Sequence, residues 1–288
     1  MRNPATTDPR SGAAAPGQPI NQRQRPRWLI AILTLAVFVT LDHFAWLPFR
    51  LVPDDLDGAM YLGALFLFRW LPWLLVPALI AAALFGPRNV IAALGLDRSP
   101  IVGLGFAAGV TLGLPLVYAI LARGSMNADP VDPLLRYALF PGVFEEILYR
   151  AFLFGFLYRF ARWGFLPAAL IGAVIFGAAH ISADGDWTEA LSIFAITAIG
   201  GFWFAWLYAE WDYNIWVPAG LHVLLNAWWE IFIIADNAVG TQATIIARFG
   251  VIGLSIAATL LLSRWRGPRR VRGANWLIGN RPPTQPPT

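Results

Sequence analysis

Two adjacent glutamates lie in an apolar and aromatic stretch, FEEILYRAFLFGFLYRF, that runs over residues 144–160. Glu145 and Glu146 are followed by Arg150 in the same stretch. A charge at the centre of a membrane helix costs about 2.5–3.5 kcal/mol on insertion scales, so two glutamates are not expected to face lipid. They must face protein or a hydrated cavity.

The spacing of these residues separates the two carboxylates. Glu146 and Arg150 are four residues apart, which allows them to pair on one face of a helix. Glu145 is rotated from Glu146 by about 100° and does not share that partner. We therefore expect one carboxylate to be neutralised and the other to be available for chemistry.

Two further segments carry polar groups inside apolar runs. In HVLLN, His222 and Asn226 are four residues apart and project from one helical face. In FGAAH, His180 closes an apolar run, with Phe176 one turn before it.

A convergent cluster of Glu145, His180, His222 and Asn226 is the simplest arrangement that satisfies all of these groups. A buried glutamate near histidine is an arrangement typical of a general base, and imidazole and amide N–H groups suit a developing oxyanion. The residues predict hydrolysis of an acyl bond by activated water.

Structural interpretations compete with this one. Glu146 and Arg150 could be only a buried ion pair, and His43, beside Asp42 at the end of a span, fits an interhelical hydrogen bond without any catalytic role. Arg69 and Glu230 are explained equally well by side chains that reach the membrane surface. The combination of several such groups, rather than any one of them, favours a site.

The elements that must position these residues are membrane helices. Of the 288 residues, 58% are apolar and only 13% are charged, and the mean hydropathy is +0.58. A hydrocarbon core of about 30 Å needs roughly 20 helical residues per crossing. We expect an all-α bundle with spans at about 28–48, 59–85, 101–122, 136–159, 164–183, 189–209, 214–235 and 242–263.

The two ends of the chain are polar and are expected to be disordered tails, over residues 1–27 and 264–288, around a bundle at 28–263. The first apolar run is longer than a secretory signal and indicates a signal anchor. All 21 basic residues are arginine. The loop arginines Arg88, Arg98, Arg159 and Arg162 fall on the side of the two tails, whereas the opposite loops carry the acidic stretches PDDLDG, NADPVDP and ADGDWTE. Both termini are therefore expected in the cytoplasm.

The chain lacks cysteine, which excludes disulfides and thiolate metal sites. The arginines concentrate in the tails and short connections, where orientation signals belong, so nucleic acid is not an expected partner. The Ala-rich, Cys-free, all-Arg composition indicates a bacterium with a GC-rich genome, and hence a bacterial cytoplasmic (inner) membrane protein. Lipid and a membrane-associated peptide or protein are the expected partners.

The three motifs resemble those of a known family. EEILYR matches E-E-x-x-x-R, FGAAH matches F-x-x-x-H and HVLLN matches H-x-x-x-N, in this order and on separate apolar segments. They are similar to the CAAX prenyl protease and bacteriocin-processing (CPBP) family of intramembrane proteases, also called Abi proteins. The resemblance covers about residues 100–235.

This resemblance implies roles for the matching residues. Glu145 and His180 would activate water, His222 and Asn226 would hold the oxyanion, and the pair Glu146 and Arg150 would organise the site. Members of the family have been discussed as metal-dependent and as glutamate proteases. Glu145, His180 and His222 could ligate zinc or another divalent ion, but their spacing is not HExxH, and we prefer a metal-free mechanism.

Other intramembrane proteases fit the sequence poorly, because it has no G-x-S-G, HExxH or G-x-G-D motif. Two alternatives of other classes stay open: a proton-coupled transporter, and a non-catalytic scaffold or immunity protein whose polar cluster is structural. With both termini inside, the fourth span enters from the outer face, which places Glu145 and His180 in the outer half of the membrane.

Overall fold

A computed structural model gives the architecture of the protein and describes residues 25–44, 47–53, 56–181, 186–235, 239–266 and 269–279. This part of the chain is helical and contains no strand. In the first half lie α1 (Arg27–Phe44), η1 (Pro48–Leu51), α2 (Gly58–Leu65), η2 (Phe66–Trp70), α3 (Pro72–Phe85), η3 (Pro87–Asn89), α4 (Val90–Ala93), α5 (Pro100–Thr111) and α6 (Leu114–Leu121). The second half holds α7 (Val131–Pro133), η4 (Leu134–Leu139), α8 (Phe140–Glu145), η5 (Glu146–Phe154), η6 (Phe156–Phe160), α9 (Phe165–Ala179), α10 (Trp187–Glu210), α11 (Trp216–Phe232), α12 (Gln242–Arg266) and η7 (Gly273–Trp276).

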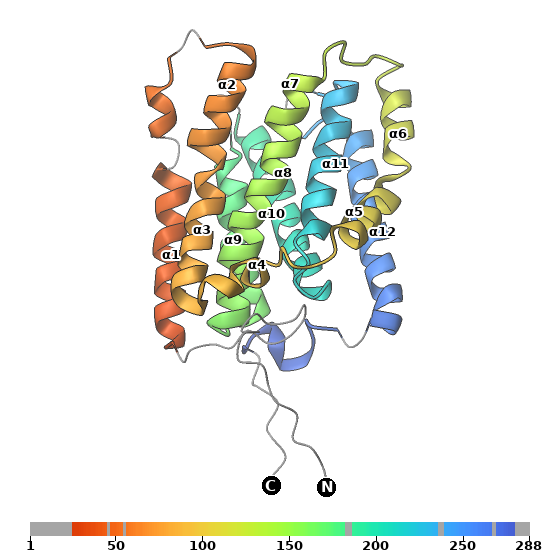
Figure 1. Cartoon of the computed structure of the whole chain (residues 1–288). Helices are drawn as coiled ribbons and strands as arrows, with labels where there is room; N and C mark the ends of the chain where they lie inside the picture. The colour runs from red at the N-terminus through yellow and green to blue at the C-terminus, as the bar shows by residue number, and fades with distance from the viewer. Residues whose placement is uncertain are drawn as a thin grey trace, which may run out of the picture.

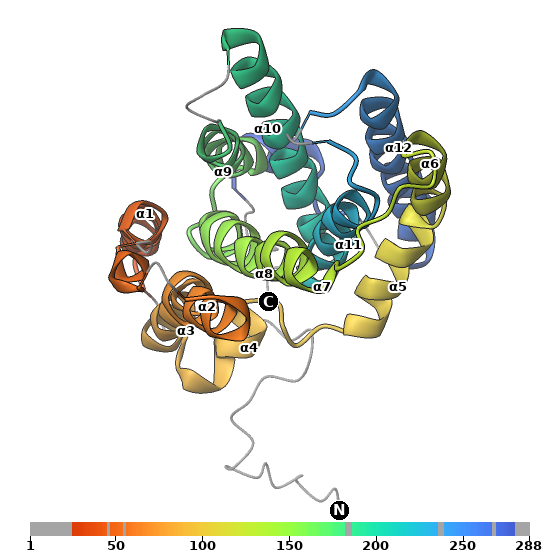
Figure 2. The same ribbon diagram turned by 90° about the horizontal axis from the view of Figure 1, so that it is seen from above.

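The long helices stand side by side as a bundle (Figure 1). Seen from above, α8 lies between α2 and α3 on one side and α11 on the other, and α9 and α10 stand next to each other (Figure 2). The helical membrane bundle expected from the composition is therefore confirmed.

The described helices match the predicted spans in position but not all in length. Four are long and apolar enough to cross a membrane by themselves: Arg27–Arg50, Gly58–Phe85, Trp187–Glu210 and Gln242–Trp265. The bent pair α5 and α6, with 41° between them, makes a fifth if it is one span. At 15 and 17 residues, α9 and α11 are shorter than those four.

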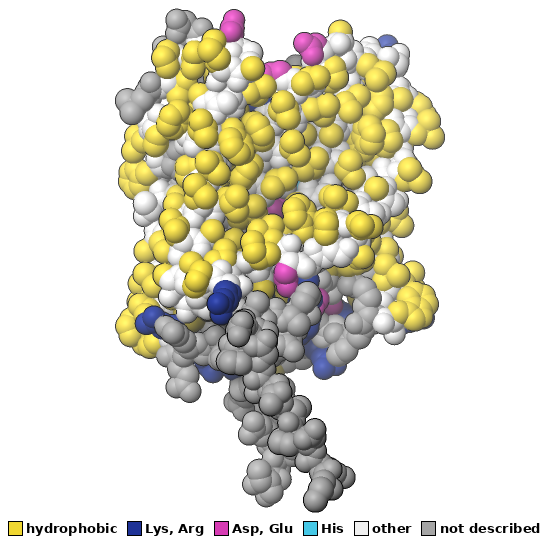
Figure 3. Space-filling model, viewed as in Figure 1, with side chains coloured by type: hydrophobic (Ala, Val, Ile, Leu, Met, Phe, Trp, Pro, Cys, Tyr) yellow, Lys and Arg dark blue, Asp and Glu magenta, His cyan; other side chains and the backbone are white. Residues whose placement is uncertain are grey.

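The outer surface agrees with a bundle embedded in lipid. Apolar side chains cover the face between the two ends, most of the basic side chains in view lie toward the lower end, and acidic side chains lie at both ends (Figure 3). The expected orientation rests on this gathering of arginines at one end. The orientation itself stays a prediction.

The fourth helical segment is unusual because π-helical turns interrupt it. The π-helical stretches η4, η5 and η6 surround the short α8, so that Glu145 ends an α-helix and Glu146 begins a π-helix. All nine residues of η5 are buried. Single π turns inside helices are rare and are frequent at functional sites, which draws attention to this junction.

A glycine brings this junction against α11. A Cβ added at Gly142 would lie 2.8 Å from the backbone nitrogen of Val223 and 2.9 Å from its Cα, so the backbones of α8 and α11 meet there. Small residues allow such close approach between membrane helices. Since Val223 follows His222, this contact sets the distance between the two glutamates and the histidine.

The C-terminal strap, which we define as residues 269–279, packs across one end of the bundle. The backbone N–H of Val271 donates to Glu210 Oε1 at 2.9 Å, and the Val271 side chain is fully buried. Trp276 meets Phe165 edge-on, with 5.2 Å between ring centroids. The predicted tail 264–288 therefore contains structured residues up to 279, while residues 1–24, 267–268 and 280–288 lie outside the described part.

We expect Glu210→Ala to lower the free energy of unfolding by about 1–3 kcal/mol, because it leaves the buried N–H of Val271 without its acceptor. Thermal unfolding of the purified protein in detergent measures the effect. Asp57→Ala is the matched control, since Asp57 is exposed and its side chain makes no capping hydrogen bond. A melting temperature equal to that of the control would contradict the role given to the strap.

Candidate active site

The site is built where the α8–η5 junction meets α11. Glu146 Oε1 accepts a hydrogen bond from His222 Nδ1 at 2.8 Å and forms an ion pair with Arg150, whose Nη1 lies 3.0 Å away. The Glu146 side chain is completely buried and the Arg150 side chain is 2% exposed. The pairing of Glu146 with Arg150 that the spacing predicts is thus confirmed, and His222 joins it as a third member.

Aromatic rings surround the buried guanidinium. Arg150 lies over the ring of Phe176, 4.5 Å from its centroid, and over that of Phe204 at 5.3 Å. The negative faces of these rings stabilise a cation that has little contact with water. The rings also fix the side of Glu146 that faces away from His222.

Glu146 determines which nitrogen of His222 is available for chemistry. An ionised carboxylate only accepts hydrogen bonds, so His222 Nδ1 must carry a hydrogen. The other ring nitrogen, Nε2, lies 3.9 Å from Glu145 Oε2, which is too long for a hydrogen bond. The imidazole therefore stands between the two neighbouring carboxylates, bound to one and facing the other.

Glu145 points in a different direction from Glu146 along the helix and, as predicted, does not share its partner Arg150. No ion pair joins it to Arg150 within the described part of the chain, and its side chain is 13% exposed. Its Oε2 atom is buried and has no hydrogen-bond donor among the described residues. Glu145 is thus the carboxylate of the pair that retains capacity to accept a proton.

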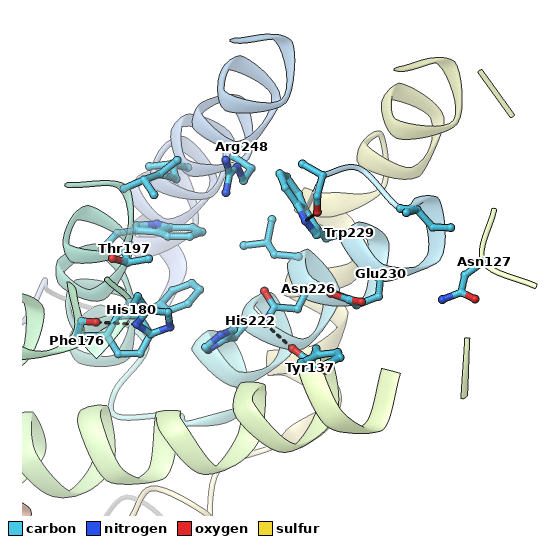
Figure 4. Close-up of a pocket in the computed structure, with 18 residues that line it drawn as sticks. Asn127, Tyr137, Phe176, His180, Thr197, His222, Asn226, Trp229, Glu230 and Arg248 are labelled. Carbon is cyan, nitrogen blue, oxygen red and sulfur yellow. Dashed lines mark hydrogen bonds between the residues drawn. The ribbon is translucent and has the colours of Figure 1, made fainter. Parts of the chain in front are cut away.

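A cavity of about 730 Å³ opens beside this cluster and is lined by His180, His222 and Asn226 (Figure 4). Asn127 and Ala235, on connections at the end of the bundle opposite the C-terminal strap, also line it. Three of the four residues predicted to converge therefore share one cavity. Glu145 is not among the lining residues, but its Oε2 lies 3.9 Å from Nε2 of His222, which is part of the cavity wall.

His180 lies in the same cavity but does not contact the glutamates directly. Its Nδ1 is 2.7 Å from the carbonyl oxygen of Phe176 and so donates to it, which leaves Nε2 as its second functional atom. The Phe176 ring lies close to both imidazoles, with centroid distances of 4.4 Å to His180 and 6.2 Å to His222. The predicted pairing of His180 with Glu145 finds no direct contact.

Asn226 also has a partner that its sequence position did not predict. Its Nδ2 donates to the carbonyl oxygen of Tyr137 at 2.9 Å, across the gap between α11 and η4 (Figure 4). This bond uses one of the two N–H groups of the amide. It fixes the amide at the wall of the cavity.

A second polar contact near the site escaped the sequence interpretation. The hydroxyl of Tyr149 donates to Asp42 Oδ1 at 2.6 Å and ties η5 to α1. Asp42 stands beside His43 at the end of a span, and this pair was interpreted as structural. The sequence feature that could have pointed to this contact is Asp42 itself. An acidic side chain at the edge of an apolar helix is costly to place in a membrane, so it is expected to have a polar partner.

The residues do not form a metal site. Within the described ranges, no three His, Cys, Asp or Glu side chains are grouped so that they could hold an ion. Glu146 is committed to Arg150 and His222, and His180 Nδ1 to a carbonyl oxygen. We therefore derive no chemical step through the divalent ion that the resemblance allows.

Comparison with known proteins supports the motif assignment. Residues 127–228, which hold all three motifs, match the family model described as Type II CAAX prenyl endopeptidase Rce1-like. The chain is similar to the Bacillus subtilis (strain 168) protein named "Putative membrane peptidase YdiL", with 38% identity over 84 residues. That match covers 29% of this chain and 30% of the relative, so less than a third of the relative's length is spanned. No solved structure matches the chain significantly. Residues 127–228 are therefore similar to the family that the three motifs resemble.

Proposed function

We propose that this protein is an intramembrane endopeptidase that hydrolyses a peptide bond in a membrane-associated peptide or protein. The observation that carries the proposal is the position of His222 between Glu145 and Glu146, at the wall of a cavity inside the bundle. The Rce1-like family model and the membrane peptidase relative support the reaction class.

In the proposed mechanism, Glu145 accepts a proton from the attacking water as the water oxygen bonds to the carbonyl carbon of the substrate. His180 directs its Nε2 into the same cavity and orients that water. Collapse of the tetrahedral intermediate breaks the C–N bond, and the proton held by Glu145 passes to the leaving amine. The products are a new carboxyl terminus and a new amino terminus.

Two groups are placed to stabilise the oxyanion. Asn226 offers an amide N–H at the cavity wall, and His222 offers Nε2 whenever that nitrogen is protonated. Glu146 keeps the His222 ring in one orientation, as outer partners do for catalytic imidazoles, and Arg150 balances the Glu146 charge. Glu146 and Arg150 thus act by holding other residues in place.

The cavity reaches toward the end of the bundle that lies opposite the C-terminal strap. If both termini are cytoplasmic, as the arginine distribution predicts, this is the outer side of the bacterial inner membrane. We therefore propose that substrates enter from the outer half of the membrane.

The proposal is tested with the purified full chain in lipid nanodiscs and a library of membrane-anchored peptides. Mass spectrometry of the products should show a pair of complementary fragments with the wild type. His180→Ala should remove that pair, while Asp57→Asn, an exposed change far from the cavity residues, should keep it. Fragments produced equally by His180→Ala and the wild type would contradict the proposed site.

A further inference from the structure

Arg69 is a charged residue inside the second helical segment that the mechanism above does not use. It belongs to the π-helical turn η2, within the candidate span Gly58–Phe85. Its guanidinium lies over the rings of Trp73, at 4.1 Å from the centroid, and Trp70, at 5.1 Å. Both tryptophans are buried, whereas the Arg69 side chain is half-buried.

Burial of a cation at this depth calls for a compensating charge. The Nη1 atom of Arg69 is buried and has no hydrogen-bond acceptor among the described residues. Two carboxylates lie on helices packed near it, Glu145 at the end of α8 and Asp42 in α1. Since Asp42 already accepts the hydrogen bond of Tyr149, Glu145 is the remaining counter-charge.

The packing places η2 directly beside the α8–η5 junction. Phe144, which precedes Glu145, stacks on Trp70 with 6.3 Å between centroids and meets Phe66 edge-on at 5.8 Å. Figure 2 shows α8 between the α2–α3 segment and α11. Glu145, at the end of α8, therefore lies between the segment that carries Arg69 and the helix that carries His222.

The two unsatisfied atoms complement each other. Oε2 of Glu145 is a buried acceptor and Nη1 of Arg69 a buried donor, and neither has a hydrogen-bond partner in the described part of the chain. No direct ion pair joins these two residues within 4.0 Å, so their attraction acts across a longer gap. In surroundings of low polarity, such an attraction stays strong over several ångströms.

We propose that Arg69 is a positioning residue that holds the carboxylate of Glu145 from the side of the α2–α3 segment. This inference rests on the role proposed above for Glu145. Tyr149 supports the arrangement, because it binds Asp42 and meets Trp73 with 6.2 Å between centroids. Arg69 and Asp42 lie outside residues 127–228, so the N-terminal helices contribute to the site.

A double-mutant cycle tests the coupling without any substrate. Arg69→Gln should lower the melting temperature of the purified protein, because the charge of Glu145 loses its partner. In a Glu145→Gln background the same change should lower it by less than half as much, since no charge remains to be compensated. Equal losses in the two backgrounds would overturn the proposal.

Arg136→Gln is the matched control for this cycle. Arg136 also lies over an aromatic ring, Tyr61, at 4.3 Å, but it pairs with Asp132 at 2.9 Å. Arg136→Gln should therefore lower the melting temperature by the same amount in the wild-type protein and in the Glu145→Gln protein. If Arg69→Gln does not fold, Arg69→Met, which removes the charge but keeps an apolar stem against the tryptophans, takes its place in the cycle and should show the same dependence on Glu145.

Turnover separates positioning from a purely structural role. Arg69→Gln should lower kcat by about 10–100-fold with little change in KM, the pattern of a misplaced reacting group, and Arg69→Lys should recover most of it. An unchanged kcat, or no recovery with lysine, would contradict the proposal. If the wild type cleaves no peptide at all, the proposed function fails, while the stability cycle still decides whether Arg69 and Glu145 are coupled.

Discussion

Glu145→Gln is expected to lower kcat for peptide cleavage by about 10²–10⁴-fold, the usual contribution of a general base. The glutamine amide has the shape of the carboxylate but cannot accept the proton of the attacking water. The ion pair of Glu146 with Arg150 and its hydrogen bond with His222 do not involve Glu145, so the buried cluster should survive the change. The measurement is the rate of fragment formation, followed by mass spectrometry under single-turnover conditions in nanodiscs.

The control for this prediction is Asp57→Asn, which makes the same chemical change at an exposed position. It should leave kcat unchanged. The Glu145→Gln protein should elute and melt as a folded protein, which distinguishes lost chemistry from lost structure. A folded Glu145→Gln protein that keeps the wild-type rate would show that another group activates the water.

The second large effect is on stability. Arg150→Met should lower the free energy of unfolding by about 3–5 kcal/mol, because it leaves Glu146 as a buried charge without its cation. Combining it with Glu146→Gln should recover a large part of the loss, since the charge itself is then removed. Unfolding of the purified protein in mixed micelles, with increasing denaturing detergent, gives the four free energies.

An exposed ion pair of the same spacing is the control for this cycle. Arg136 and Asp132 are also four residues apart and 2.9 Å from each other, but their side chains are 26% and 42% exposed. Arg136→Met should therefore cost less than about 1 kcal/mol. A loss for Arg150→Met no greater than that of the control would contradict the view that the Glu146 charge depends on Arg150.

The sequence predicted the parts of the site that depend on local spacing. The i, i+4 relation is enough to pair Glu146 with Arg150, and the cost of charge in lipid is enough to turn both glutamates inward. The division of labour between Glu145 and Glu146 follows from one residue of helical rotation. None of these inferences needs knowledge of the other helices.

The parts that the sequence did not predict depend on contacts between distant segments. The two ring nitrogens of His222 allow it to bind Glu146 and to face Glu145 at the same time. Sequence spacing alone cannot show that a histidine from another helix lies between two neighbouring glutamates. The π-helical turn that starts at Glu146 also alters the α-helical rotation assumed for this segment. The carbonyl partner of Asn226 depends on the packing of η4 against α11.

The C-terminal strap shows a limit of compositional reasoning. The arginines, glycines and prolines of residues 264–288 are typical of a disordered tail, and that composition led to the prediction for this segment. One buried carboxylate, Glu210, and one buried apolar side chain, Val271, hold the segment on the bundle instead. Two specific contacts of this kind leave little trace in average composition.

The most direct test of the account is cleavage of a membrane-anchored peptide by the wild-type protein in ¹⁸O-labelled water, read by mass spectrometry. We predict that the new carboxyl terminus carries ¹⁸O from the first turnover and that Glu145→Gln yields no such product. Product that forms without ¹⁸O in its new carboxyl terminus, or labelled product formed equally by Glu145→Gln, would contradict hydrolysis by water activated at Glu145.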